Sequence, residues 1–402
     1  MELLGDMAAT DQGETWWRAA IAHERFPPVF AKTLDGQRYS PIETIKGDGA
    51  SGQYSGAALS EYRHHPREIF DALSLGFACA ATQRPALARD LMFGLTPVRV
   101  RIVGTALNTL IEESCGHLAC QAEQAPAATI DLWSPQPGDA PWLAEPLPAA
   151  ATRWGRLVFD RERRVQHDWR PTSNAAIDTA ARRIVGCFPD PAALTADELA
   201  KPLHRLIGGL ITPDGAALVH AAAVGEDGEA VLLAAPGGSG KSTTALACRL
   251  AGMDYLGDDY VALGMAGGSA TVHSLYASGM VASGPLDGMV NRAGPSPATL
   301  PRDEPKRLFR FDGVCRRARV AAILLPRIGA GPVTTLSPAS PGDFLRAAAP
   351  HSLLANAQDR AATLDIMARA AASVPIRRIL LGPDLGEVVA TVRDIVGRKA
   401  AA

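Results

Sequence analysis

The second half of the chain alternates between short apolar runs and glycine-rich turns. Apolar runs of roughly four to eight residues predict strands, and apolar residues that recur every three or four positions predict helices. We therefore expect strands over 216–224, 229–235, 254–263, 320–325 and 376–381, and helices over 241–252, 341–371 and 384–396. An Asp-Gly turn at 227–228 predicts that the first two strands form an antiparallel hairpin. This alternation of strands and helices indicates an α/β fold.

The first half of the chain has a less regular pattern. It predicts helices over 66–92, 175–185 and 202–210, and strands over 97–103 and 156–159. A glycine- and serine-rich piece at 47–56 indicates a linker or loop, and the proline-rich interval 125–149 indicates a surface loop. We therefore expect three parts: a partly helical N-terminal extension with a glycine-rich loop (1–88), an α+β module (89–210) and a C-terminal domain (211–397) that carries the candidate catalytic residues identified below.

The composition is typical of globular proteins that work in water. Of the 402 residues, 47% are hydrophobic and 20% are charged. The formal net charge of −2 gives no reason to expect binding to nucleic acid or to a membrane. The N-terminus lacks the features of a signal peptide, and no apolar stretch approaches the roughly 18 residues that span a bilayer. The six cysteines lack the spacing of a disulfide framework or a metal site. We therefore expect a cytoplasmic protein with reduced thiols.

The most informative stretch is a glycine-rich turn that leads from an apolar strand into a helix. Its residues are Gly237, Gly238, Ser239, Gly240, Lys241, Ser242 and Thr243. Backbone N–H groups in such a turn can wrap a polyphosphate, and the helix N-terminus adds a favourable dipole. Lys241 would neutralise the outer phosphates, and Ser242 would offer its hydroxyl to Mg²⁺. The usual pattern opens with glycine where this chain has Ala235. A plain capped turn would not explain a lysine at a helix start, where the dipole disfavours cations.

Three further side chains are candidates for catalysis beside this turn. Asp258 and Asp259 follow Lys241 by 17 and 18 residues, on the predicted strand 254–263. Phosphoryl transfer needs a metal anchor and a carboxylate that orients or deprotonates the acceptor hydroxyl. Neighbouring residues of a strand face opposite ways, so we expect one carboxylate to reach the phosphates and the other to point elsewhere. His220 lies on the strand that pairs with the strand before the turn, so folding brings it beside the turn.

His220, the segment 235–242 and the Asp258-Asp259 pair resemble the catalytic core of the HPr kinase/phosphorylase family. The resemblance is strongest over residues 211–263. The Ala-Pro that opens the turn resembles the residues at this place in one branch of the family. That branch is the HPr-kinase-like peptide serine kinases of lasso-peptide-type biosynthesis. The resemblance implies a mixed sheet like that of phosphoenolpyruvate carboxykinase, with ATP and Mg²⁺ as cofactors.

The resemblance also implies roles for single residues. Lys241 would bind phosphate, Ser242 and Asp258 would hold the metal, Asp259 would be the base for the acceptor hydroxyl, and His220 would support the active centre. The family has a further metal-binding glutamate later in the chain, but the matching region 274–283 has no acidic residue. This departure argues against the reverse, phosphorylase, activity.

The favoured function is therefore an ATP-dependent kinase that transfers the γ-phosphate to a serine or other hydroxyl of a peptide or protein. Two alternatives remain: a kinase for a small hydroxyl metabolite such as free serine, and a regulatory module that binds ATP without catalysis. The resemblance is also compatible with a homo-oligomer. Lys306, Arg307, Arg310 and Arg327 are further basic residues that could hold a phosphate.

Overall fold

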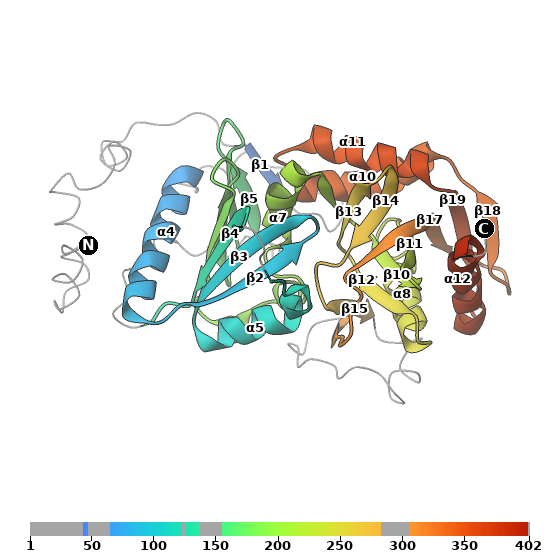
Figure 1. Cartoon of the computed structure of the whole chain (residues 1–402), viewed down its shortest axis with the longest axis horizontal. Coiled ribbons are helices and arrows are strands. Elements are labelled where there is room, and N and C mark those ends of the chain that lie inside the picture. Colours follow the sequence, from blue (N-terminus) through green and yellow to red (C-terminus); the bar gives the residue numbers. More distant parts are fainter. Residues whose placement is uncertain (1–42, 47–64, 122–124, 137–154, 283–305, 401–402) are drawn as a thin grey trace.

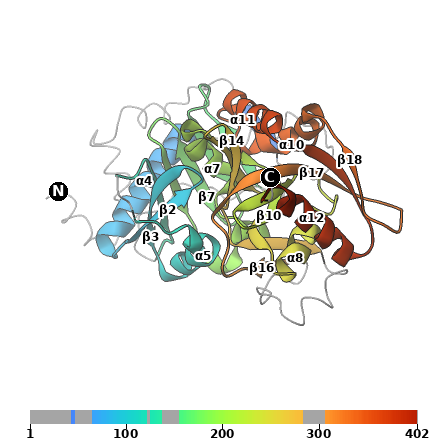
Figure 2. The same cartoon turned by 45° about the vertical axis from the view of Figure 1, so that its right-hand side comes forward.

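The computed structural model describes residues 43–46, 65–121, 125–136, 155–282 and 306–400 (Figure 1). These residues form two large β-sheets that lie side by side, each covered by helices (Figures 1 and 2). The strands of the N-terminal sheet come from residues 43–187, and those of the C-terminal sheet come from residues 216–381. The arrangement is α/β, as the sequence pattern predicts.

The N-terminal sheet has eight strands in the order β1-β5-β6-β7-β8-β4-β3-β2. Their bounds are β1 Glu43–Lys46, β2 Leu87–Phe93, β3 Thr96–Val103, β4 Ala128–Trp133, β5 Arg156–Phe159, β6 Val165–Trp169, β7 Asn174–Asp178 and β8 Arg183–Cys187. Strand β4 is parallel to both its neighbours, and the other pairs are antiparallel. Helix α4 (Pro66–Gln83) covers one face, and helices α5 (Thr105–Cys115) and α7 (His204–Ile211) cover the other.

The C-terminal sheet has nine strands, in the order β12-β10-β11-β17-β14-β13-β9 with β19 paired to both β17 and β18. Their bounds are β9 Ala216–Val219, β10 Ala222–Glu226, β11 Glu229–Leu233, β12 Asp254–Gly257, β13 Val261–Ala266, β14 Ser269–His273, β17 Arg317–Ile328, β18 Thr335–Pro338 and β19 Ile376–Leu381. The pairs β11–β17 and β17–β19 are parallel and the others are antiparallel, so the sheet is mixed. This agrees with the sheet that the family resemblance implies.

Two pairs of helices enclose the C-terminal sheet. Helices α8 (Lys241–Leu250) and α12 (Leu385–Ala400) pack on one face, and α10 (Pro341–Ala355) and α11 (Arg360–Ser373) pack on the other. A separate two-stranded sheet consists of β15 (Ser278–Ala282) and β16 (Lys306–Arg310), and the short helix α6 (Ala196–Ala200) lies against β15. The predicted hairpin is confirmed, because Glu226 pairs with Glu229 around a turn in which Asp227 and Gly228 both have positive φ. The predicted strand 376–381 is also confirmed.

Three predictions for the first half of the chain are wrong. The predicted helix 66–92 ends at Gln83, and β2 follows, because Pro85 disfavours helical backbone at Arg84. The predicted loop 125–149 contains strand β4. The predicted helix 175–185 is instead the antiparallel hairpin β7–β8. Ile184 and Val185 point to different faces of the sheet, where each packs in its own hydrophobic cluster. This burial on both faces overrides the helix propensity of the alanines in the segment.

Two predicted strands of the second half are broken, and the breaks shape the site. The predicted strand 216–224 is interrupted at His220, so β9 pairs with β13 while β10 pairs with β11 and β12. The predicted strand 254–263 is interrupted at Asp258, Asp259 and Tyr260, between β12 and β13. The two aspartates therefore lie in a bend and not on a strand, because Asp259 has a left-handed φ of 70° that no strand accommodates.

The predicted boundaries at residues 88 and 210 stay predictions. Helix α4 packs on the N-terminal sheet, and β2 runs across the first of these boundaries. The glycine- and serine-rich piece 47–56 lies outside the described residues. Among the helices that are described, none combines the length and the hydropathy that a crossing of the bilayer requires.

Candidate functional site

A glycine loop, residues 234–240, connects the C-terminal end of β11 to helix α8. Gly238 and Gly240 have φ values of 77° and 99°, in the left-handed region that favours glycine. A β-carbon on Gly240 would lie 2.5 Å from Cδ1 of Leu381, whereas a β-carbon on Gly237 or Gly238 would meet open space. The loop is therefore packed where it enters α8 and open at its first glycines. The first N–H groups of α8 have no partner within the helix, which is the arrangement that attracts anions.

Lys241, the first residue of α8, folds back over the loop. Its Nζ donates to the carbonyl oxygens of Ala235 at 2.6 Å and of Pro236 at 3.1 Å. Burial lowers the pKa of Lys241 to about 8, although the nearby Asp258 carboxylate opposes the shift. The hydroxyl of Ser239 is buried and has no hydrogen-bond partner among the described residues. A buried ammonium and an unpartnered hydroxyl at a helix start both fit an anionic group at this loop.

Asp258 lies against the first turn of α8. The hydroxyl of Ser242 donates to its Oδ1 at 2.8 Å, and the backbone N–H of Met280 donates to its Oδ2 at 3.3 Å. Burial raises the pKa of Asp258, and the hydrogen bond from Ser242 opposes the shift. A buried carboxylate beside a hydroxyl offers the oxygen ligands that Mg²⁺ prefers, and Mg²⁺ usually takes its remaining ligands from water and phosphate. Within the described ranges, no cluster of three or more His, Cys, Asp or Glu could hold a metal by itself.

Asp259 and His220 meet at the two strand breaks. Nδ1 of His220 lies 3.1 Å from Oδ1 of Asp259, but the angle is not that of a hydrogen bond. The backbone N–H of His220 donates to Oγ of Ser352 on α10 at 3.0 Å, and this hydrogen bond holds the chain in place between β9 and β10. Burial, with Lys241 as the next cause, lowers the pKa of His220 to about 2, so its imidazole is neutral. A neutral imidazole next to a carboxylate can accept or orient a proton.

The predicted site residues therefore gather at one place in the fold. Lys241 and Ser242 come from α8, Asp258 and Asp259 from the bend between β12 and β13, and His220 from the break between β9 and β10. The expected strand is absent at these aspartates, although their side chains do point to different neighbours. Because the bend replaces the strand, Asp258 contacts α8 and Asp259 contacts His220.

Sequence reasoning missed several residues of this cluster. Lys201 forms an ion pair with Asp259 from the segment that follows α6. The ring of Tyr260 lies between His204 and His220, with centroid distances of 5.2 and 5.4 Å. The ring of His351 lies 4.9 Å from that of His220. These contacts join residues far apart in the sequence, and no spacing or motif marks Lys201 as a partner of Asp259.

The additional basic residues do not all reach the site. Arg310 donates to Oγ of Ser114 at 2.9 Å and to the carbonyl oxygen of Leu199 at 2.8 Å, so it links β16 to α5 and α6. Arg327 is exposed near the end of β17. Lys306 is exposed as well, but it lies close enough to contribute to the lowered pKa values of His220 and Lys241.

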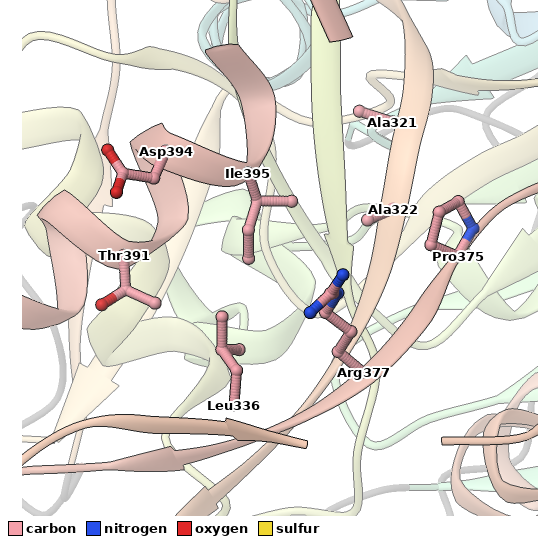
Figure 3. A pocket seen from close by; sticks show the side chains of 8 residues that line it. All are labelled: Ala321, Ala322, Leu336, Pro375, Arg377, Thr391, Asp394 and Ile395. Atoms are coloured by element: carbon pink, nitrogen blue, oxygen red, sulfur yellow. The ribbon is translucent and has the colours of Figure 1, made fainter. Parts of the chain in front are cut away.

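A cavity of about 210 Å³ lies elsewhere, between the C-terminal sheet and helix α12 (Figure 3). Ala321, Ala322, Leu336, Pro375, Arg377, Thr391, Asp394 and Ile395 line it. None of these belongs to the cluster around Lys241 and Asp259. Arg377 and Asp394 are exposed at this cavity, and its other lining residues are mostly apolar.

Comparison with known proteins finds matches among solved structures. No protein-family model and no curated protein matches the chain. A solved structure of the Hpr(Ser) kinase/phosphatase from Coxiella burnetii matches 46% of this chain and 95% of its own, with 12% identity and a TM-score of 0.23. At this identity and TM-score the likeness does not establish family membership.

Proposed function

We propose that the chain is an ATP-dependent phosphotransferase that transfers the γ-phosphate to a hydroxyl group. One observation carries this proposal: an ammonium, a hydroxyl–carboxylate pair and a second carboxylate with a neutral imidazole gather beside a glycine loop at a helix start. Phosphoryl transfer depends on positioning and charge neutralisation, and these groups supply both.

Each residue has a part in the proposed reaction. The glycine loop and the N-terminus of α8 would bind the phosphates, and Lys241 would exchange its loop carbonyls for phosphate oxygens. Ser242 and Asp258 would hold Mg²⁺, which neutralises phosphate charge when bound. The acceptor oxygen attacks the γ-phosphorus, the bond to the bridging oxygen of ADP breaks, and the hydroxyl proton passes to the carboxylate of Asp259. Neutral His220 would support the active centre beside that carboxylate.

We further propose a serine of a peptide or protein as the acceptor, and this part rests on the sequence resemblance alone. A small hydroxyl metabolite is the other candidate acceptor. The same experiment separates them: the purified full chain is incubated with ³²P-labelled ATP and Mg²⁺, first with serine-containing peptides and then with free serine. Label in the peptide or in phosphoserine identifies the acceptor class.

Lys241→Ala tests the nucleotide site itself. Removal of the ammonium should weaken ATP binding and lower kcat/KM by about 100-fold or more, because a preorganised cation at the phosphates is lost. Calorimetry measures binding and label transfer measures turnover. Arg369→Ala is the control, because Arg369 is an exposed cation on α11 that pairs with Asp365. Lys241→Ala binding ATP as tightly as the unaltered chain would contradict the proposal. ATP binding without any phosphorylated product would indicate a regulatory module.

A further inference from the structure

One cation at the candidate site comes from outside the predicted catalytic domain. Lys201 lies 58 residues before Asp259. It directly follows α6, which belongs to the predicted α+β module. Its ammonium lies between the carboxylates of Asp197, at 2.9 Å, and of Asp259. It also lies 5.4 Å from the centroid of the Tyr260 ring. The Lys201 side chain is 11% exposed, so its ammonium is largely shielded from water.

The start of helix α6 is fixed within the N-terminal half. Thr195 and Glu198 form a capping box, in which each side chain accepts from the backbone N–H of the other. The buried Glu198 carboxylate also accepts from the hydroxyls of Thr172 and Ser173, beyond the end of β6. Lys201 therefore projects from a short helix whose first turn cannot shift freely.

The end of α6 is fixed by the C-terminal half. Three of the carbonyl oxygens at this end accept from side chains of that half: Leu199 from Arg310, Ala200 from Ser278, and Pro202 from Tyr276. Side chains of β16, β15 and the segment before β15 thus hold the backbone on both sides of Lys201. Such contacts satisfy carbonyl groups that a helix end leaves without partners.

A buried chain of alternating charges anchors Lys201 from behind. Asp197 accepts from Arg170 at 3.3 Å, Arg170 donates to Asp168 at 3.0 Å, and Arg205 lies 3.1 Å from Asp168. Burial raises the pKa of Asp197, but Lys201 and other neighbouring cations outweigh this and hold it well below its usual value. The anchor is therefore ionised at neutral pH.

Asp259, in contrast, has few other restraints among the residues that the structure describes. Its side chain is 33% exposed and sits in a bend, and Nδ1 of His220 is not aligned to donate to it. A lysine ammonium has three donors that can serve two carboxylates at once. The contact with Lys201 is thus the interaction that fixes the direction of this carboxylate.

We propose that Lys201 is a positioning residue of the phosphoryl-transfer site: anchored by Asp197, its ammonium holds the Asp259 carboxylate towards His220 and the acceptor. This inference rests on the proposed function for its effect on catalysis. The orientation of Asp259 is a property of the protein alone, so it can be tested whether or not phosphate is transferred.

Lys201→Met is the principal test, because it removes the charge and keeps an unbranched side chain. We expect kcat to fall by about 100-fold, the cost of a misplaced catalytic group. The Kd for ATP should change less than about 3-fold, because Lys241 and the glycine loop are untouched. Lys201→Arg keeps the charge and should recover at least a tenth of the original kcat. Arg183→Met is the matched control, because it removes a cation from the buried Asp131, which retains Arg101, within the N-terminal sheet.

Hydrogen exchange separates the two proposals. Lys201→Met should speed exchange of the backbone N–H groups at 258–260, and Arg183→Met should not. Unchanged exchange at this bend, or an equal loss of kcat in Arg183→Met, would overturn the positioning role and leave the proposed reaction standing. Faster exchange in a chain that transfers no phosphate would support the positioning role and refute the proposed reaction.

Discussion

Asp258 and Asp259 have different surroundings because the backbone of Asp259 is left-handed. With φ of 70° at Asp259, the chain turns between two neighbouring side chains. Asp258 is buried against Ser242, whereas the side chain of Asp259 is a third exposed between Lys201 and His220. The buried carboxylate suits a metal ligand, and the accessible one suits proton transfer to or from an acceptor that enters from solvent.

Replacement of either aspartate by asparagine separates these tasks. Asp259→Asn should lower kcat by about 100- to 10,000-fold, the usual contribution of a general base, with little change in ATP affinity. Asp258→Asn should instead raise the Mg²⁺ concentration that half-maximal turnover requires. Initial rates over a Mg²⁺ series measure both effects. Near-normal turnover of Asp259→Asn would show that another group accepts the proton.

At this scale the sequence predicts the residues but not their directions. The glycine turn, the aspartate pair and His220 are visible as a pattern, because phosphate binding constrains residue types at short spacing. The bend at Asp259 is not visible, since positive φ is uncommon for a residue other than glycine and the apolar residues on both sides predict one continuous strand. Lys201 is not visible either, because its partner is 58 residues away.

Among the elements, strand β19 restricts the glycine loop at the end where the loop enters α8. Leu381, the last residue of β19, packs so closely on Gly240 that its side chain would have to shift to admit a β-carbon there. Gly237, three residues earlier, has open space at the same position. The loop is therefore held by the sheet at its helical end and free at the end that would meet phosphate.

This contrast predicts different effects of two alanine substitutions. Gly240→Ala should lower the free energy of unfolding by about 1–3 kcal/mol, because it combines a strained φ with a clash. Gly237→Ala should leave it unchanged or raise it by up to about 1 kcal/mol, because the unfolded chain loses freedom. Urea titration of both variants measures the difference. Equal stabilities would show that Leu381 moves aside without cost.

Element prediction succeeds where local signals are strong and fails where burial decides. The Asp227-Gly228 turn fixes its hairpin, because only a few residue types adopt that backbone. The segment 175–185 is rich in alanine and looks helical, yet it forms two strands whose faces contact different hydrophobic clusters. That outcome depends on neighbours that the local sequence does not specify.

For the whole molecule, helix α7 joins the two sheets through a shared hydrophobic cluster. Its apolar side chains share one hydrophobic cluster with Ile177 of the N-terminal sheet and Leu218 of the C-terminal sheet. A β-carbon on Gly208 would lie 2.5 Å from Oδ1 of Asn356, a side chain that also pairs with the backbone of Leu218. The close approach at this glycine brings α7 against the end of α10.

We therefore expect Gly208→Ala to destabilise the whole protein despite the better helix propensity of alanine. The clash should cost about 1–3 kcal/mol. Gly397→Ala is the matched helical control: nothing lies near its β-carbon position, so a gain of up to about 1 kcal/mol is expected. Calorimetric melting compares the two. A stabilised Gly208→Ala variant would show that the contact between α7 and α10 is loose.

The ion pair between Lys201 and Asp259 also limits which hybrid proteins can be made from the C-terminal half of this chain. A hybrid that grafts residues 211–397 onto a foreign N-terminal half would inherit the acid without its counter-ion. Such a hybrid could fold and bind nucleotide and still turn over poorly. Successful grafts would have to carry the segment around α6, together with Thr172 and Ser173, whose hydroxyls fix its first turn.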